Sequence, residues 1–329
     1  MNFGKIPPQL LWIPGGALYG LLMRWLFGTF SSALQGPMSI AFLIGTPFVV
    51  GALTIYGMRR QDPSVTAMMF APWLSILLMF VGCALSMMEG LICLAMMLPF
   101  FLFFATMGGL VMGTALRLLK EQHAPLRAVA VLPFLLVLAD RALPMPDRQV
   151  EVHQSIEVHA SPHTIWQQIL TARDIRPDEL PFSVSHFIGV PKPVEGINRR
   201  TPEGEVRFSR WERGVHFEGI VTDRQEDRSI TWRYRFGPHS FPPGSMDDHV
   251  AVGGRYFDLG DTSFQLTPMP GGTTRVDLVA HYRVSSSINF YAVPVAKFLG
   301  RDFEHTILAL YKRRSERAEG GTGVAGAAQ

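Results

Sequence analysis

The feature that most constrains this chain is a change of character near residue 145. Up to about residue 144 the sequence consists of long apolar runs, and its charged residues fall in short gaps between them. From residue 146 to about residue 317 it is an ordinary mixture of apolar and charged residues. Long apolar runs suit hydrocarbon and the mixture suits water. The sequence therefore predicts an α-helical transmembrane bundle over residues 1–144, joined to a folded aqueous domain over residues 145–318.

The distribution of charge agrees with this division and excludes one class of partner. Only 17% of all residues are charged, below the roughly 25% that is typical of soluble domains. Residues 1–148 hold 9 of the 30 basic and 5 of the 27 acidic side chains, so the aqueous part carries 21 and 22. Because the aqueous part is nearly neutral, we expect no nucleic-acid partner.

Five apolar stretches are candidate membrane spans, since a helix needs about 20 residues to cross about 30 Å of hydrocarbon. They are residues 9–29, 37–57, 66–88, 91–116 and 126–144. The fifth is the weakest, and a re-entrant or interfacial helix is the alternative there. The pairs Gly16–Gly20 and Gly109–Gly113 have the spacing that lets membrane helices pack closely, within one chain or in a homo-oligomer.

Basic residues in short loops mark the cytoplasmic side of a membrane protein. In this chain those loop residues are Lys5, Arg59, Arg60, Arg117, Lys120 and Arg127. They predict an integral protein of a bacterial inner or plasma membrane with a cytoplasmic N-terminus. Five spans place the C-terminal domain outside the cytoplasm, and four spans place it inside.

The aqueous part predicts an α+β domain. Alternating residues predict a strand over residues 148–159, and Ser161 and Pro162 begin a helix as N-cap and first helical residue. Further strands are predicted near residues 183–190, 205–211, 215–223, 229–236, 254–268 and 273–285. A long helix is predicted over residues 288–317, followed by a disordered Gly/Ala-rich tail over residues 319–329.

Two segments carry a resemblance to a known family. They are the opening "VEVHQSIEVHASPHTIWQQIL" and the closing "TTRVDLVAHYRVSSSINFYAVPVAKFLGRDFEHTILALYKRR". Over residues 148–317 the chain resembles the START-like superfamily, also called SRPBCC or the polyketide cyclase type. That resemblance implies a helix-grip fold, in which a curved antiparallel sheet wraps around a long C-terminal helix and encloses an apolar cavity. Its members bind sterols, lipids, polyketides or plant hormones, and a few catalyse cyclisation, but no universal catalytic signature assigns residue roles here.

Aromatic residues in the predicted sheet and long helix are candidates for the lining of such a cavity, or equally for its core. They are Trp211, Trp232, Tyr234 and Tyr291. His216 and Glu218 share one strand face, as do Asp277 and His281 on the last strand. Facing inward, they could orient a ligand; facing outward, they form cross-strand charge pairs, and the apolar opposite face of the last strand favours this second arrangement.

Asp247, Asp248 and His249 follow one another in a loop between predicted strands. Carboxylates and an imidazole could coordinate a divalent metal or serve acid–base work. Neighbours on an extended segment point alternately, however, so we interpret the segment as a solvated loop. His249 remains a candidate ligand-binding residue. Cys83 and Cys93 both lie in apolar runs, and we expect neither a metal site nor a cofactor.

These patterns lead to three hypotheses. The first is a membrane-tethered START-like domain that binds a hydrophobic ligand, such as a lipid, a quinone or a polyketide-like molecule, near the bilayer surface. The second is a cyclase- or hydrolase-like enzyme acting on a lipophilic substrate, which would need an inward-facing acid or base. The third is a membrane-anchored domain for protein interaction or sensing, whose interior would be filled by aromatic side chains.

Overall fold

The computed structural model describes residues 11–34, 36–119, 124–142, 145–247 and 252–326. The chain divides into two compact units, Met1–Pro146 and Asp147–Gln329, called here the helical unit and the grip unit. Each unit is described by itself.

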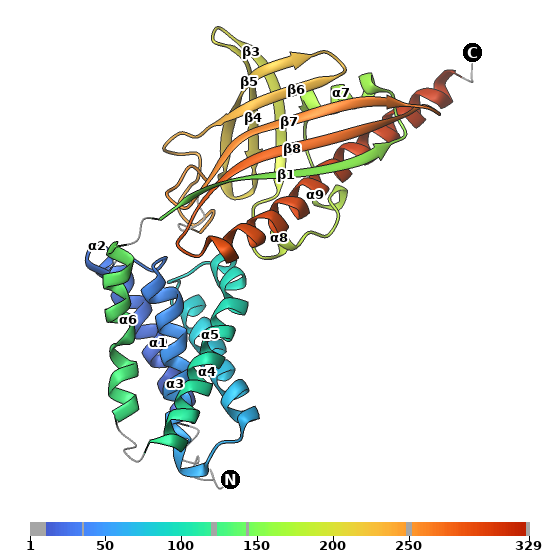
Figure 1. Cartoon of the computed structure of the whole chain (residues 1–329). Coiled ribbons are helices and arrows are strands. Elements are labelled where there is room, and N and C mark those ends of the chain that lie inside the picture. Colours follow the sequence, from blue (N-terminus) through green and yellow to red (C-terminus); the bar gives the residue numbers. More distant parts are fainter. Residues whose placement is uncertain (1–10, 35, 120–123, 143–144, 248–251, 327–329) are drawn as a thin grey trace, which may run out of the picture. The chain divides into compact units, whose positions relative to one another are not determined.

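The helical unit contains helices at all five apolar stretches (Figure 1). Its elements are α1 (Trp12–Thr29), α2 (Ser31–Leu34), η1 (Ala41–Gly45), α3 (Thr46–Gly57), η2 (Arg59–Gln61), α4 (Val65–Leu85), α5 (Leu91–Leu118) and α6 (Ala124–Ala142). Helix α3 is the centre of the bundle because ten of its twelve residues are buried. Element η1 is a short π-helix that runs directly into α3.

Small residues allow the helices to approach one another closely. A Cβ atom on Gly51 of α3 would lie 1.9 Å from the carbonyl oxygen of Ala105, and one on Gly108 of α5 would lie 1.8 Å from that of Phe48. Glycine is therefore required at this crossing. Gly16 and Gly109, from the two pairs singled out in the sequence, likewise face a neighbouring helix at distances that leave no room for a side chain.

Two of the described helices, α4 and α5, are long and apolar enough to cross a membrane. The continuous apolar helix Ala41–Gly57 is shorter. Helix α1 carries Arg24, and α6 carries Asp140 and Arg141 at its end. The five-span topology, and with it the side of the membrane on which the grip unit lies, stays a prediction.

The grip unit is an eight-stranded antiparallel sheet with a long helix along one face (Figure 1). The strands are β1 (Asp147–Val158), β2 (Thr171–Ala172), β3 (Pro193–Thr201), β4 (Gly204–Trp211), β5 (His216–Gln225), β6 (Ser229–Arg235), β7 (Phe257–Met269) and β8 (Thr273–Ser285). The helical elements are α7 (Pro162–Leu170), η3 (Pro177–Glu179), α8 (Val184–Phe187), η4 (Glu212–Gly214) and α9 (Asn289–Gly326). Ser161 caps α7 by accepting from the N–H of Thr164, as predicted.

The sheet order is β1-β8-β7-β6-β5-β4-β3-β2, so most neighbours along the chain pair as hairpins. Strand β1 instead joins β8, the last strand, over its whole length from Asp147↔Ser285 to Val158↔Thr274. This pairing brings the start and the end of the unit together, and α9 packs against β1 and β8. A curved antiparallel sheet around a long C-terminal helix is the helix-grip arrangement that the resemblance implied.

The structure differs from the predicted local structure in three places. Residues 183–190 form no strand but contain the short helix α8, because Ser183 and Asp302 accept hydrogen bonds from the N–H groups of its first turn. Strand β3, Pro193–Thr201, was not predicted. The predicted disordered tail also differs, since α9 continues to Gly326. Glu319 on this extension accepts from the N–H of Ser161 at 3.4 Å and from the hydroxyl of Thr164.

Candidate functional site

The interior of the grip unit changes along its strands from closed to partly open. On β6, the inward side chains of Ile230 and Trp232 are 0% and 3% exposed. The next two alternate residues, Tyr234 and Phe236, are partly exposed. Strand β7 shows the same trend, from buried Phe264 to partly exposed neighbours near its start. The grip unit therefore has a closed end and an open end.

The closed end is a continuous apolar core. Trp166 and Ile165 of α7, both without exposed surface, pack with Leu308 and Tyr311 of α9 and with the inward residues of β6, β7 and β8. Burial of this kind is the main source of stability in a domain of this size.

The open end is formed by five aromatic side chains, which we call the aromatic group: Trp211, Phe217, Tyr234, Phe236 and Phe303. The rings of Trp211 and Phe303 stack at 5.2 Å, and those of Trp211 and Phe217 meet edge to face at 5.1 Å. Phe217 contacts Tyr234 and Phe236 at 5.6 and 5.7 Å. Only Phe217 in this group is fully buried, so the others present apolar surface that no other side chain covers completely.

The N-terminal half of α9 carries small side chains on the helix face that also carries Phe303. Ala292, Val293 and Ala296 are partly buried and pack against a second apolar cluster, which includes Val152 and Tyr282. Alanine and valine occupy little volume, so this half of α9 leaves the interior less filled than the half that carries Leu308 and Tyr311. Partly open apolar surface of this kind is the usual lining of a site for a small hydrophobic molecule.

Arg207 on β4 is a buried cation between the two ends. It is 6% exposed, and its guanidinium donates to the carbonyl of Ile169 at 2.6 Å, to Asn198 Oδ1 at 3.0 Å and to the hydroxyl of Tyr311 at 3.0 Å. It also lies 4.9 Å from the ring centre of Trp232. Oxygen acceptors and an aromatic face together stabilise a charge that has left water.

Glu304 on α9 is a buried carboxyl group that faces Tyr282 on β8. Only 2% of Glu304 is exposed, and its Oε1 accepts from the tyrosine hydroxyl at 3.2 Å. The other oxygen, Oε2, has no hydrogen-bond partner among the described residues. Burial raises the pKa of Glu304 to about 8, against the opposing effect of the tyrosine hydrogen bond. The carboxyl group is therefore mostly protonated and neutral at pH 7.

A second tyrosine, Tyr234 on β6, also has a hydrogen-bond partner on the neighbouring strand. Tyr234 donates to the hydroxyl oxygen of Thr262 on β7 at 3.0 Å. Burial raises the pKa values of both Tyr234 and Tyr282 above the ordinary value, so both hydroxyl groups stay neutral donors. The interior thus combines apolar surface with a few neutral polar groups.

Helix α8 borders the open end and is held there by Asp302 of α9. The carboxylate of Asp302 accepts from the hydroxyl of Ser183 at 2.6 Å and from the N–H of Ser185 at 2.8 Å. Burial alone would raise the pKa of Asp302, but these hydrogen bonds hold it below its ordinary value, so the group is ionised. His186 of α8 lies 5.6 Å from the ring of Phe303, and burial lowers the pKa of its imidazole.

The predicted aromatic residues divide between core and lining. Trp232 is buried in the closed end, whereas Trp211 and Tyr234 belong to the aromatic group. Tyr291 is partly exposed in the first turn of α9, and its N–H donates to the carbonyl of Ile288. The structure therefore brings two of the four to the open end.

The charged candidates lie on the outer face of the sheet. His216 is exposed, and Glu218 accepts from Arg235 at 2.6 Å in a cross-strand ion pair. On β8, Asp277 and His281 pair with His153 and Glu151 of β1 at 3.1 and 3.4 Å. The outward arrangement is confirmed for these residues, so His216 and Glu218 do not face the interior. The reason is register, because their neighbours Phe217 and Gly219 take the inward positions. His249 and Asp248 lie outside the described residues.

Sequence reasoning missed Arg207, Tyr282, Asp302 and Glu304. A usable signal existed for two of them. Glu304 stands one turn before Leu308 within the apolar stripe of a long helix, where a charged residue is unexpected. Arg207 shares its strand face with Ser209 and Trp211. No pattern in the sequence places Tyr282 opposite Glu304, since that requires the docking of α9 on β8.

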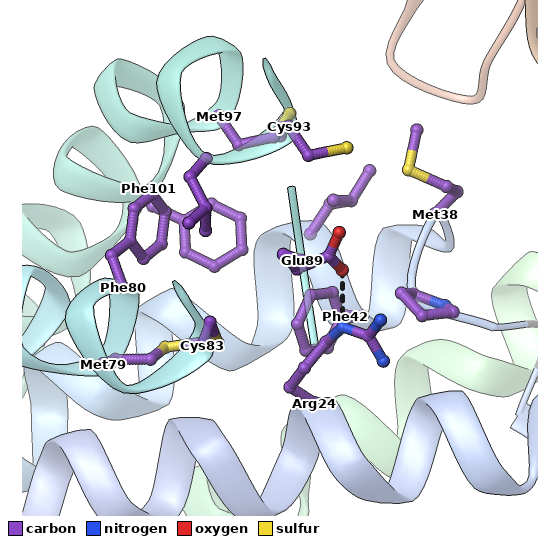
Figure 2. Close-up of a pocket in the computed structure, with 13 residues that line it drawn as sticks. Arg24, Met38, Phe42, Met79, Phe80, Cys83, Glu89, Cys93, Met97 and Phe101 are labelled. Atoms are coloured by element: carbon purple, nitrogen blue, oxygen red, sulfur yellow. Dashed lines mark hydrogen bonds and ion pairs between the residues drawn. The ribbon is translucent and has the colours of Figure 1, made fainter. Parts of the chain in front are cut away.

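The helical unit contains a small cavity beside an ion pair (Figure 2). Arg24 of α1 donates to a carboxylate oxygen of Glu89 at 2.5 Å and to the carbonyl of Met88 at 2.7 Å. Cys83 and Cys93, which are buried and form no disulfide, line the same cavity. Its volume of about 30 Å³ admits water but no organic ligand. We therefore interpret it as a packing defect beside a structural ion pair, and the candidate site remains the open end of the grip unit.

Comparison with known proteins gives structural likeness alone. A scan against models of known families finds no match, and a search of curated proteins finds none either. The C-terminal half resembles solved structures of START-like and polyketide cyclase-like proteins. A START superfamily protein from Mycobacterium smegmatis is 15% identical, with a TM-score of 0.35, and the match covers 51% of this chain and 98% of that one.

Two enzymes are among the other solved structures that match. The Zhui aromatase/cyclase from Streptomyces sp. R1128 is 12% identical over 52% of this chain and 95% of its own, with a TM-score of 0.33. Norcoclaurine synthase from Thalictrum flavum is 12% identical over 52% of this chain and 87% of its own, with a TM-score of 0.31. At these scores the likeness carries no argument about function, and the helix-grip assignment rests on the strand order and on α9.

Proposed function

We propose that this protein binds a hydrophobic small molecule in the open end of the grip unit and that the helical unit holds this site at a membrane. The observation that carries the proposal is the partly exposed aromatic group on the inner face of the sheet. Aromatic and aliphatic side chains that remain partly exposed on a concave inner face gain free energy when an apolar molecule covers them.

The polar groups near the open end favour a neutral ligand. Glu304 is mostly protonated, the hydroxyl groups of Tyr234 and Tyr282 are neutral, and Arg207 already donates to three oxygen atoms. A charged ligand buried here would lack a free opposite charge among the described residues of the inner face. A lipid-like or quinone-like molecule with a neutral polar group is the class that we propose.

The apolar surface of the helical unit supports attachment to a membrane. Helix α4 exposes a continuous set of large apolar side chains, namely Val65, Met69, Phe70, Trp73, Leu74, Leu77, Leu78, Val81 and Leu85. Soluble proteins rarely leave so much contiguous apolar surface in water, whereas lipid chains would cover it. A ligand that partitions into lipid would then be concentrated where the grip unit is tethered.

The first experiment is native mass spectrometry of the full chain, released from detergent micelles or nanodiscs. A retained small-molecule adduct, lost on denaturation, is the expected result. Substitution Ala296→Trp should abolish the adduct, because the indole would project from the helix face that also carries Phe303 and would occupy the open end. Thr222→Trp, at an exposed position of β5, is the matched control and should retain it.

The outcomes separate the proposal from its rivals. An adduct that is equally abundant in wild type and Ala296→Trp would place the bound molecule elsewhere and overturn the site. A folded chain with no adduct, even after incubation with extracted membrane lipids, would overturn ligand binding and favour a protein-interaction role.

A further inference from the structure

The grip unit exposes a distinct set of phenylalanine side chains. Among its described residues, the exposed large apolar side chains are Phe182, Phe187, Phe290 and Phe298, with exposed fractions of 78%, 73%, 71% and 57%. We call these four the phenylalanine surface. An exposed phenylalanine forgoes the free energy that burial of its ring would give, so four of them on neighbouring elements are costly unless something covers them.

The four phenylalanines lie on or beside two elements that contact each other, α8 and α9. Phe187 is the last residue of α8, Phe182 precedes the helix, and their rings lie 6.1 Å apart. Phe290 and Phe298 lie on α9, eight residues and therefore about two turns apart, on the side of the helix opposite the inward Ala292, Ala296 and Phe303. Asp302, one turn after Phe298, binds the first turn of α8 and so fixes α8 beside this half of α9.

Basic residues outnumber acidic ones on the part of α9 that carries Phe290 and Phe298. The segment from Asn289 to Arg301 contains Lys297 and Arg301 and no acidic residue. Of the next two carboxyl groups, Glu304 is buried and mostly protonated, whereas Asp302 is ionised and accepts hydrogen bonds from α8, so the two basic residues outnumber one charged carboxylate here. Exposed aromatic side chains between basic residues are typical of segments that lie in the headgroup region of an anionic bilayer.

We propose that the phenylalanine surface docks on an anionic lipid surface, with the four rings in the interfacial region and with Lys297 and Arg301 at the phosphate groups. Both basic residues stand within one helix face that also carries Phe298, so rings and charges can reach one surface together. The chain also carries α4 and α5, two helices apolar enough to cross a bilayer, which would keep such a surface within reach.

Docking would place the candidate site at the lipid. His186, which lies between Phe182 and Phe187 in the sequence, contacts the ring of Phe303, a member of the aromatic group. The phenylalanine surface therefore borders the open end, and a ligand could pass between bilayer and interior without crossing bulk water. The inference goes beyond the proposed function, because docking requires no ligand and can be tested without one.

The test uses the full chain, one copy per nanodisc, with an environment-sensitive nitrobenzoxadiazole label on Phe187→Cys. Cys83 and Cys93 are buried, so the chain without an added cysteine sets the labelling background. In nanodiscs of phosphatidylcholine and phosphatidylglycerol we expect blue-shifted emission that doxyl-labelled lipid quenches. The label on Thr222→Cys, at an exposed position of β5, is the control and should show neither effect.

Charge removal gives an independent measure. Each of Lys297→Gln and Arg301→Gln should lower the ratio of docked to undocked protein about fivefold in anionic nanodiscs. In purely zwitterionic nanodiscs the two substitutions should have little effect. Arg301 is exposed and Lys297 is partly exposed, so we expect both variants to fold.

Three outcomes would overturn the proposal. If the label at residue 187 shows the same emission and the same lack of quenching as the label at residue 222, the phenylalanine surface is exposed to water and does not contact lipid. Blue-shifted emission without quenching by doxyl lipid shows contact with protein instead of lipid. Quenching that does not change with anionic lipid content or with the two glutamine substitutions shows that the charges have no part in docking. Each result is separate from the adduct measurement, which reports ligand binding alone.

Discussion

The two ends of the grip unit use the same elements for different purposes. At the closed end, α9 presents Leu308 and Tyr311 to Trp166 and to buried residues of the sheet, and little surface remains accessible. At the open end, the same helix presents Ala292, Ala296 and Phe303 to aromatic side chains that stay partly exposed. From this difference we infer that the closed end stabilises the grip unit, whereas the open end remains available for binding.

The largest effect is expected from a substitution in the apolar core of the closed end. Trp166→Ala should lower the free energy of unfolding by about 3–5 kcal/mol, because a fully buried indole leaves a cavity that its neighbours cannot fill. Chemical denaturation of the full chain in detergent, followed by near-ultraviolet circular dichroism, measures it. A loss comparable to that of a surface substitution would show that the closed end is not the core that stabilises the unit.

The second prediction concerns the pH dependence of the free energy of unfolding, and the group responsible is Glu304. Glu304 has an ordinary pKa of 4.5 in the unfolded chain and a pKa of about 8 in the folded protein. Between these values the folded protein keeps a proton that the unfolded chain has lost, so the free energy of unfolding should fall as pH rises from 4.5 to about 8.

The variant Glu304→Gln has no such proton, so its free energy of unfolding should change much less over the same range. The other groups near this carboxyl are Tyr282 of β8, Tyr234 of β6 and Arg301 of α9, and the tyrosines stay neutral throughout. Denaturation curves at several pH values compare the two proteins. Parallel pH profiles for both would contradict the raised pKa.

A smaller effect on stability is expected at the open end. Phe303→Ala should cost about 1 kcal/mol, since the ring is only partly buried and its removal uncovers less apolar area. The same variant should lose most of the retained ligand, whereas the folded fraction of Trp166→Ala should keep it. If Phe303→Ala proves as destabilising as Trp166→Ala and still binds, the two ends do not differ in the way described.

The smallest effect lies on the outer face of the sheet. His216→Ala should change the free energy of unfolding by less than about 0.5 kcal/mol and leave ligand retention unaltered. The side chain is exposed, and its hydrogen bond is to the nearby carbonyl of Gly214. Native mass spectrometry and denaturation of this variant check both statements. A loss of the adduct in this variant would indicate that the ligand binds on the outer face of the sheet.

The sequence could predict those helices and strands that are determined by local patterns. The Ser161 cap, the strands from residue 205 onward and the long helix follow from capping chemistry and from alternation. Strand β3 was missed because Pro193 and Gly196 weaken its pattern, yet Gly196 is required there: a Cβ atom would lie 2.3 Å from the guanidinium of Arg207. That requirement comes from a residue on another strand.

The candidate site was predictable in its aromatic part only. Trp211 and Tyr234 could be singled out by residue type, but the choice between core and lining needed the gradient of burial along β6. Inward and outward faces could be told apart on β8, where alternation is clean. Glu304 and Asp302 depend on how α9 docks on β8 and α8, and such contacts between distant segments leave no mark on either segment alone.

Helix α9 has one further consequence. It contains 38 residues, so it is a rod about 57 Å long, and its only proline is Pro294, close to its start. After that proline the helix has no further proline at which a sharp kink could absorb a displacement. Any shift of the helix that follows occupation of the open end must therefore reappear at the opposite tip, where Glu319 binds Ser161 and Thr164. A change in the contacts of Glu319 would therefore report that a ligand occupies the open end.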